Sequence, residues 1–361
     1  MQLKDVIKKL ALITTVASVL FTPLIVQAAS AEYKWKMVTT WPKNFPGLGT
    51  GANDLANQIN VMSNGRIQVK VYGAKELVGA LEVFDAVSRG TAEMGHGAAY
   101  YWKGKVPAGQ FFAAVPFGLT AQEMNGWIYS GGGLKLWQEA YAPFGIIPMP
   151  GGNTGVQMGG WFNKEIKTLD DLKGLKMRIP GLGGEVLKRA GGTPVLLPGG
   201  EIFPALQSGA IDATEWVGPY NDMAFGLYKA AKYYYYPGWH EPGTTLEALI
   251  NKKAFDKLPK DLQAIVLNAT KVANSNMLAE YTARNNAALQ SLVTDHKVKL
   301  LPYPAEVLSQ LKTLSDEVVA EEAQKDEMSK KVYASYIAFR DQAVDWHAVS
   351  EQAYLNARNP E

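Results

Sequence analysis

Two segments of the chain, residues 84–94 and 203–213, follow one pattern: Phe-x-Ala-aliphatic-x-x-Gly-x-apolar-acid-apolar. Each follows an apolar stretch and a turn that contains Gly and Glu. Glycine adopts the left-handed backbone that ends many helices, so each copy predicts a helix that stops near Gly90 or Gly209 and leads into a strand. The alternative is chance similarity between two common units. A true repeat predicts two related α/β lobes with a ligand cleft between them.

Strand-like and helix-like segments alternate along the first two thirds of the chain, which predicts α/β units around a mostly parallel sheet. We expect strands at 33–40, 67–72, 92–97, 175–179 and 194–197, and helices at 49–63, 77–89 and 185–190. The last third is different, because helix formers dominate it. There we expect helices at 260–296 and 304–358, separated by a short extended piece at 300–303.

The N-terminal segment has the three-part layout of a secretory signal. Lysines precede an apolar stretch, residues 10–26, and small residues follow at 28–31. A membrane anchor is the alternative, but the stretch is short for a span and no basic cluster follows it. We therefore expect residues 1–28 to be a signal peptide that is cleaved on export to the periplasm. No later stretch reaches the roughly 20 apolar residues that a membrane span needs.

The composition argues against several classes of protein. The 361-residue chain has no cysteine, which excludes disulfides, thiol nucleophiles and thiolate metal sites. Its formal net charge is +2, and without a basic block nothing favours nucleic-acid binding. The four histidines are scattered, and neither a Gly-x-Ser-x-Gly elbow nor a complete dinucleotide motif is present. These features favour a binding protein over an enzyme.

Three successive segments, residues 153–163, 169–181 and 206–216, carry a more specific pattern. Their succession, above all Leu-x-Asp-Leu-Lys-Gly-Leu-Lys-Met-Arg, closely resembles the solute-binding subunits of tripartite ATP-independent periplasmic (TRAP) transporters. The loop 216–221 and the aromatic run that leads into Pro-Gly-Trp-His-Glu at 237–241 resemble the branch that binds 2-oxo acids such as pyruvate together with a metal ion. The resemblance covers essentially the whole mature chain.

This resemblance implies a two-lobed periplasmic-binding-protein fold, the Venus flytrap, with a long interdomain helix and a helical C-terminus. We expect lobe I to comprise residues 33–154 and 243–296, and lobe II with the C-terminal helices to comprise residues 155–242 and 297–361. A ligand would enter the open cleft, the lobes would close, and the closed form would dock on TRAP membrane subunits that move the solute with sodium. The branch also implies a homodimer formed through a C-terminal helix.

Arg178 is the first candidate for the ligand site. A guanidinium offers paired donors that match a carboxylate, and Arg178 ends a predicted strand just before Ile-Pro-Gly. The resemblance assigns it to the ligand carboxylate, with Gln157 and Asn221 as further ligand contacts. Tyr100 and Tyr101 are expected at the lip of the other lobe, where they would cover the ligand's apolar tail. Packing in an aromatic core is the alternative for both tyrosines.

The resemblance also implies a cation beside the ligand. Glu215, Glu241, Gln157 and the backbone carbonyl of Trp216 would surround it. Oxygen ligands suit Na⁺, with Ca²⁺ as the alternative. A cation between acidic residues and an acidic ligand removes a repulsion that would be costly in a dry cleft. From the sequence alone, without the resemblance, each glutamate would be interpreted as an ordinary surface acid.

Several functions remain open at the level of sequence. A 2-hydroxy acid such as lactate offers nearly the same oxygens as pyruvate. A periplasmic enzyme acting on a small acid, or a sensor subunit that presents the closed form to a membrane receptor, would use similar binding chemistry. The sequence favours the transport receptor, because it shows no catalytic constellation.

Overall fold

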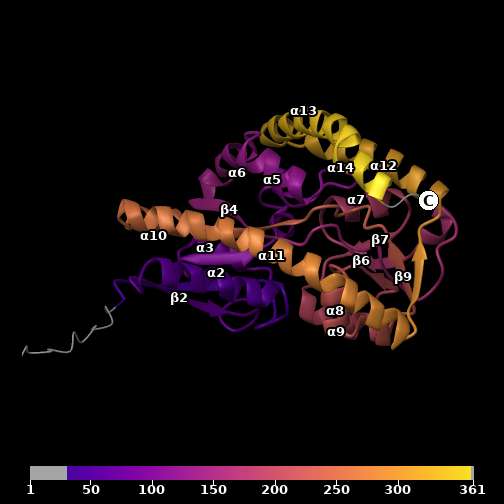
Figure 1. Cartoon of the computed structure of the whole chain (residues 1–361), viewed down its shortest axis with the longest axis horizontal. Coiled ribbons are helices and arrows are strands. Elements are labelled where there is room, and N and C mark those ends of the chain that lie inside the picture. The colour runs from indigo at the N-terminus through magenta and orange to yellow at the C-terminus, as the bar shows by residue number, and fades with distance from the viewer. Residues whose placement is uncertain (1–30, 359–361) are drawn as a thin grey trace, which may run out of the picture. The chain divides into compact units, whose positions relative to one another are not determined.

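The computed structural model describes residues 31–358 and shows two β-sheets with helices packed around them (Figure 1). The predicted signal peptide, residues 1–28, lies outside the described residues. Among the described helices, none combines the length and the apolar composition needed to cross a bilayer. The predicted α/β class is confirmed by the mixture of strands and helices.

The first sheet has five strands in the order β2-β1-β3-β10-β4. They are β1 (Tyr33–Thr39), β2 (Ile67–Tyr72), β3 (Met94–Gly97), β4 (Ile146–Asn153) and β10 (Thr245–Asn251). In β2, Ile67 and Val69 are buried whereas Gln68 and Lys70 are exposed, which is the period-two pattern of a strand with one face in the core. Every residue of β10 is buried, since this strand lies between two others in the sheet.

The second sheet has six shorter strands in the order β11-β9-β5-β8-β6-β7. They are β5 (Gly160–Phe162), β6 (Lys176–Arg178), β7 (Thr193–Val195), β8 (Ala213–Thr214), β9 (Tyr233–Tyr236) and β11 (Lys299–Pro302). Both sheets are mixed rather than mostly parallel. The antiparallel pairings involve β10 in the first sheet and β5 in the second, the strands that follow when the chain crosses between sheets.

Helices cover both sheets. They are α2 (Leu48–Met62), α3 (Val83–Ser88), α4 (Gln110–Ala113), α5 (Ala121–Tyr129), α6 (Gly133–Tyr141), α7 (Gly181–Arg189), α8 (Gly199–Ser208), α9 (Pro219–Phe225), α10 (Lys252–Asp256), α11 (Lys260–Thr294), α12 (Ala305–Ala323), α13 (Glu327–Val349) and α14 (Glu351–Arg358). Short 3₁₀ helices include η1 (Ala99–Trp102) and η4 (Leu169–Leu172). At η4 a capping box is present, with Thr168 and Asp171 as its partners.

The 35-residue helix α11 extends along both sheets (Figure 1). At 1.5 Å per residue it is about 52 Å long. It packs on α2 and β4 beside the first sheet and on α9 beside the second. The long helix that the resemblance implied is therefore present.

The C-terminal helices take different partners. Helix α12 packs on α7, whereas α13 returns to α4, α5 and α6 beside the first sheet. There the Leu119 backbone N–H donates to the hydroxyl oxygen of the buried Tyr336 over 2.8 Å. These contacts fix the first half of α13, and its second half continues into α14, which has no buried residue.

The two copies of the repeated motif occupy matching places in different sheets. Helix α3 is followed by Gly90 and strand β3, and α8 is followed by Gly209 and strand β8. Both glycines have the left-handed backbone predicted for them, with φ of 77° and 75°. The repeat therefore corresponds to one helix–glycine–strand unit in each sheet.

Two local predictions were wrong. The helix expected at 77–89 is confined to α3, because a turn precedes it in which the Glu82 carboxylate accepts a hydrogen bond from the Gly79 N–H. The helix expected at 185–190 begins four residues earlier, because α7 starts at Gly181. Here the helix lies close to its neighbours: a Cβ on Gly183 would lie 2.9 Å from the His240 Cβ, and one on Gly184 would lie 2.8 Å from the Ile179 carbonyl oxygen.

Candidate functional site

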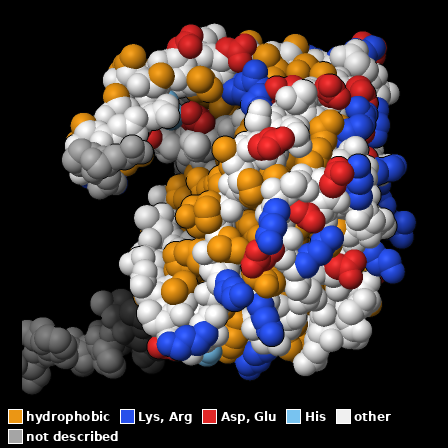
Figure 2. Space-filling model, turned by 90° about the vertical axis from the view of Figure 1, so that its right-hand side faces the viewer, with side chains coloured by type: hydrophobic (Ala, Val, Ile, Leu, Met, Phe, Trp, Pro, Cys, Tyr) orange, Lys and Arg blue, Asp and Glu red, His pale blue; other side chains and the backbone are white. Residues whose placement is uncertain are grey.

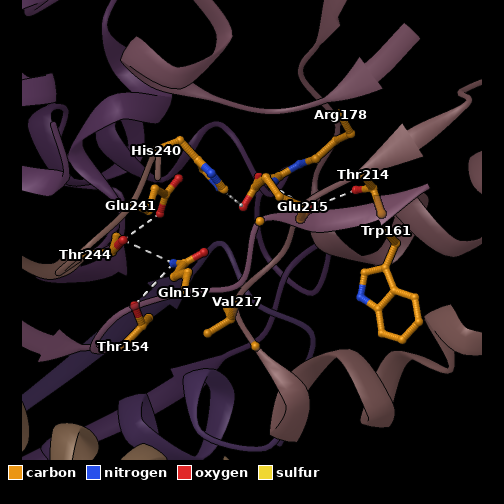
Figure 3. Close-up of polar contacts among 12 residues, drawn as sticks. Thr154, Gln157, Trp161, Arg178, Thr214, Glu215, Val217, His240, Glu241 and Thr244 are labelled. Atoms are coloured by element: carbon orange, nitrogen blue, oxygen red, sulfur yellow. Dashed lines mark hydrogen bonds and ion pairs between the residues drawn. The ribbon is translucent and has the colours of Figure 1, made fainter. Parts of the chain in front are cut away.

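The predicted site residues come from strand ends and from the two segments by which the chain crosses between sheets. Arg178 ends β6, and Glu215 directly follows β8 on the neighbouring strand. Gln157 lies on the crossing from β4 to β5, and Glu241 lies on the crossing from β9 to β10. Figure 3 shows these side chains gathered in one region. The fold thus joins residues that are up to 84 positions apart in the sequence.

Arg178 is 1% exposed and is held on several sides. Its Nη1 donates to the Glu215 carboxylate, its Nε donates to the Leu197 carbonyl oxygen over 3.2 Å, and its Nη2 donates to the Tyr101 hydroxyl over 3.1 Å. The guanidinium also lies over the Trp216 ring, 5.1 Å from the centroid. Burial opposes its charge and is the largest single effect, but Glu215, Tyr101, Tyr100 and Glu241 together outweigh it and raise the pKa of Arg178. The cation is therefore fixed in place and stays charged.

Glu215 uses only one carboxylate oxygen in this pair. Its Oε1 accepts from Arg178, while Oε2 has no hydrogen-bond partner among residues 31–358. Burial raises the pKa of Glu215 to about 7, although Arg178 acts in the opposite direction. A buried oxygen without a partner is costly, so its presence indicates a place for a ligand or an ion.

Glu241 is the second buried carboxylate of the site. Its Oε2 accepts from the Thr244 hydroxyl over 2.6 Å and from the Tyr100 hydroxyl over 3.5 Å. Burial, with the charge of Glu215 nearby, raises the pKa of Glu241 to about 7. Two buried acids that oppose each other's ionisation are stabilised by a cation placed between them.

The amide of Gln157 has a defined orientation. Its Nε2 donates to the hydroxyl oxygens of Thr154 and Thr244 over 3.2 and 3.1 Å. Because Thr244 gives its own proton to Glu241, it must accept from Gln157, so the amide nitrogen faces it. The amide oxygen, Oε1, is buried and has no partner within the described part of the chain. Gln157 therefore presents an oxygen, as a hard cation requires.

His240 belongs to the same cluster, although the sequence did not single it out. Its Nε2 lies 3.5 Å from Glu215 Oε2, and one ligating atom each from Glu215, His240 and Glu241 lie within 4.8 Å of one another. Burial lowers the pKa of His240 to about 4, so the ring is neutral. The sequence offered one indication, its position next to Glu241, but no second histidine at a metal-binding spacing drew attention to it.

The remaining predicted residues lie in different settings. Tyr100 and Tyr101, on η1, reach Glu241 and Arg178 through their hydroxyls and also pack against each other, with ring centroids 4.9 Å apart. Trp216 is buried beside Arg178. Asn221 donates to the Pro46 carbonyl oxygen over 2.9 Å and accepts from the Tyr281 hydroxyl over 2.7 Å. Its amide is therefore engaged with the protein, and its contact with a ligand stays a prediction.

The arrangement suits recognition of an anion with a cation beside it. A fixed guanidinium and the free oxygens of Glu215 and Gln157 lie in one buried cluster, where electrostatic interactions are strong. The donor set for a cation is made of carboxylate and amide oxygens, which fits Na⁺ or Ca²⁺.

Known proteins are similar to this chain in sequence and in fold. A family model described as bacterial extracellular solute-binding protein, family 7 (DctP), matches residues 37–326. A monocarboxylate 2-oxoacid-binding periplasmic protein of Nostoc is 50% identical over 331 residues, which cover 92% of this chain and 90% of the relative.

Solved structures of TRAP periplasmic solute-binding proteins superpose on the fold. One from Pseudoalteromonas atlantica, described with bound sodium and pyruvate, has a TM-score of 0.87 at 45% identity and covers 90% of this chain and 98% of its own. One from Bordetella bronchiseptica, a dimer described with copurified calcium and picolinate in one site, has a TM-score of 0.89 at 38% identity and covers 91% and 98%. The matched length, the fold and the identity together place this chain in the DctP family of TRAP solute-binding proteins.

Proposed function

We propose that this chain captures a short 2-oxo monocarboxylate such as pyruvate, together with a cation, and presents it to TRAP membrane subunits for sodium-coupled uptake. Members of its family are solute receptors and not enzymes. The observation that carries the proposal is the buried Arg178–Glu215 pair, beside which Glu215 Oε2 and Gln157 Oε1 lack partners in the described chain.

Arg178 binds the ligand carboxylate in this proposal. A guanidinium carries five N–H donors, and the contacts to Leu197, Glu215 and Tyr101 leave one N–H on Nη2 unused. The ligand carboxylate takes this donor and competes with the Tyr101 hydroxyl for the other. Tyr100 and Tyr101 then cover the ligand from the side of the first sheet. Asn221 contacts the ligand only if binding breaks the hydrogen bonds that its amide makes with Pro46 and Tyr281.

The cation is held by Glu215, Gln157, Glu241 and the Trp216 carbonyl oxygen. It is Na⁺, with Ca²⁺ as the alternative, because the donors are oxygens. Pyruvate and picolinate, the ligands named for two related structures, each carry a carboxylate next to a second donor atom. A 2-oxo acid likewise offers two donors to one ion, which would favour it over an acid without the oxo group. Lactate keeps both oxygens and is the alternative ligand.

The organisation of the chain fits this role. Lobe I comprises residues 33–154 and 243–296 and holds the first sheet, whereas lobe II with the C-terminal helices comprises residues 155–242 and 297–361 and holds the second. The family acts outside the cytoplasm. Residues 1–28 serve as the cleaved signal that directs the chain to the periplasm.

The chain forms a homodimer through its C-terminal helices. Large apolar side chains at the end of α13 and on α14 are 45–73% exposed: Val344, Trp346, Val349, Tyr354 and Leu355. Figure 2 shows hydrophobic side chains along the arm that these helices form at the upper left, with a hollow beneath it. A second copy is the occupant that we propose for this surface, because the Bordetella bronchiseptica relative is described as a dimer.

A ligand panel tests the proposal. Purified mature chain is stripped of ligand and titrated with pyruvate, 2-oxobutyrate, lactate and propionate in sodium- or calcium-containing buffer, with thermal stability as the readout. We expect the order 2-oxo acid, then 2-hydroxy acid, then propionate. Equal stabilisation by propionate would refute the chelating role of the oxo group. Release of a changed product, followed by NMR, would instead establish an enzyme.

A further inference from the structure

His240 is a buried polar group that the proposed function leaves unused. Its side chain is fully buried, and within residues 31–358 neither ring nitrogen has a hydrogen-bond partner. Buried polar groups in native proteins are nearly always satisfied, so an exception points to a missing partner. The other fully buried histidine, His96, is satisfied: the Trp41 indole contacts its Nδ1 over 2.7 Å, and Gly151 O lies 3.0 Å from its Nε2.

The free imidazole is directed at the cation ligands. Its Nε2 lies 3.5 Å from Glu215 Oε2, the oxygen that Arg178 leaves free. A carboxylate oxygen of Glu241 completes a set of three atoms that lie within 4.8 Å of one another. Figure 3 shows the side chains of His240, Glu215, Glu241 and Gln157 pointing toward a common space. Four potential ligands from three chain segments therefore converge.

Their separations fit a small divalent metal. Bonds of about 2.0–2.2 Å from metal to nitrogen or oxygen place neighbouring ligands about 3 Å apart and opposite ligands about 4.2 Å apart. The observed separations require only small inward movements. Neutral imidazole prefers Co²⁺, Ni²⁺, Cu²⁺ or Zn²⁺, whereas Na⁺ and Ca²⁺ take oxygen and gain little from nitrogen. A purely hard cation thus leaves His240 unexplained.

We infer that the cation compartment also accepts a first-row divalent transition metal, with His240 Nε2 as the ligand that holds it. The inference rests on the proposed function and extends it: the protein captures a transition-metal complex of a 2-oxo acid as well as its sodium or calcium complex. The 2-oxo acid supplies two oxygens, and Glu215, Glu241, Gln157 and His240 supply the protein ligands. No bond of the ligand is broken.

Calorimetry with Co²⁺ and Ca²⁺ on metal-stripped protein, in saturating pyruvate, tests this inference. His240→Asn should lose about tenfold or more in Co²⁺ affinity, the usual scale for a weakened metal site, and change Ca²⁺ affinity by less than about twofold. His296→Asn, which alters an exposed histidine, is the matched control and should bind Co²⁺ as the wild type does. Equal Co²⁺ affinity in wild type and His240→Asn would overturn the inference, as would a parallel loss of Ca²⁺ and Co²⁺.

A second measurement covers the case in which His240→Asn does not fold. X-ray absorption at the cobalt edge of the wild-type complex should show the multiple-scattering pattern of one imidazole. A spectrum with oxygen ligands alone would overturn the inference. Pyruvate that fails to bind with Na⁺ or Ca²⁺ would instead contradict the proposed function, so the two failures are distinguishable.

Discussion

Arg178 and Glu215 form an ion pair in which each side chain is only 1% exposed. They lie at the ends of neighbouring parallel strands, β6 and β8, so the sheet itself sets their separation. A buried pair of this kind contributes little net stability, because both charges lose their hydration. Its value lies in holding a charged guanidinium in one orientation before the ligand arrives.

Arg178→Ala should abolish binding of the 2-oxo acid, whereas Arg178→Lys should retain a weak fraction of it. Lysine keeps the charge but lacks the planar fork that matches a carboxylate. Removing one partner of a buried pair costs about 3–5 kcal/mol. Glu215, whose pKa is already raised to about 7, can take up a proton and soften this cost. Calorimetry and urea unfolding check the two effects, and undiminished binding by Arg178→Ala would remove Arg178 from the site.

Cation affinity should rise between pH 6 and pH 8. The pKa values of Glu215 and Glu241 are raised to about 7, mainly by burial, so protons compete with the cation below that pH. Stability of the cation-free protein should change in the opposite sense. A carboxyl group whose pKa is higher in the folded state stabilises the fold fully below its unfolded pKa near 4.5. That contribution is lost as the pH rises through its folded pKa of about 7.

Glu215→Gln provides the control for this pH dependence. Asp222 and Glu247 also have pKa values raised by burial, to about 7 and about 8, and they weaken the cation-free fold in the same pH range. The variant should therefore keep part of the stability loss, while its cation affinity becomes low and rises less steeply with pH, because only Glu241 still titrates among the two acidic ligands. Calcium titrations at four pH values measure this, and an unchanged slope would exclude Glu215 as a ligand.

Ion pairs outside the candidate site also join the elements around the two sheets. Lys103 contacts Glu185 over 2.6 Å, and Lys75 contacts Glu201 over 2.9 Å; each pair links a loop beside the first sheet to α7 or α8. Partly exposed pairs contribute modestly, so Lys103→Glu should weaken ligand affinity by about two- to fivefold through easier opening. The charge-swapped double variant Lys103→Glu/Glu185→Lys should restore affinity. If the double variant binds the ligand as weakly as the single variant does, the pair does not hold the two sides of the molecule together.

Dimerisation should depend on the apolar side chains of the C-terminal helices. The double variant Trp346→Ala/Val349→Ser removes two of the most exposed ones, at 64% and 73%, without touching the buried half of α13. We expect it to be monomeric in light scattering at concentrations where the wild type is a dimer, with unchanged pyruvate affinity. A monomeric wild type, or a dimer that survives both substitutions, would contradict the proposed interface.

Local patterns predicted much of the framework. Strand β2 coincides with the predicted range because Ile67 and Val69 alternate with polar residues. The repeated motif predicted both left-handed glycines because its chemistry is local to one turn. The early start of α7 was missed, since Gly183 lies against His240, a distant part of the chain. The turn before α3 was missed although its hydrogen bond from the Gly79 N–H to Glu82 spans only three positions.

In the candidate site, too, some residues could be predicted from the sequence and others could not. Chemistry and family resemblance together selected Arg178, Glu215, Gln157 and Glu241, and the fold places them in one cluster. His240 was not predicted, because no pattern of spacing in the sequence points to it. Its importance comes from its spatial proximity to Glu215, which is 25 positions away in the sequence. No local pattern shows that Gln157 turns its oxygen inward, because the orientation follows from a hydrogen-bond chain through Thr244.

In the proposed function, anion and cation bind together between Arg178 and the free oxygens of Glu215 and Gln157. Titration of pyruvate into metal-stripped protein by calorimetry, with and without Na⁺ or Ca²⁺, tests it most directly. We expect one pyruvate per chain with the cation present and at least a tenfold loss of affinity without it, since cation and ligand share donors. Equal affinity in both buffers, or no binding in either, would contradict it.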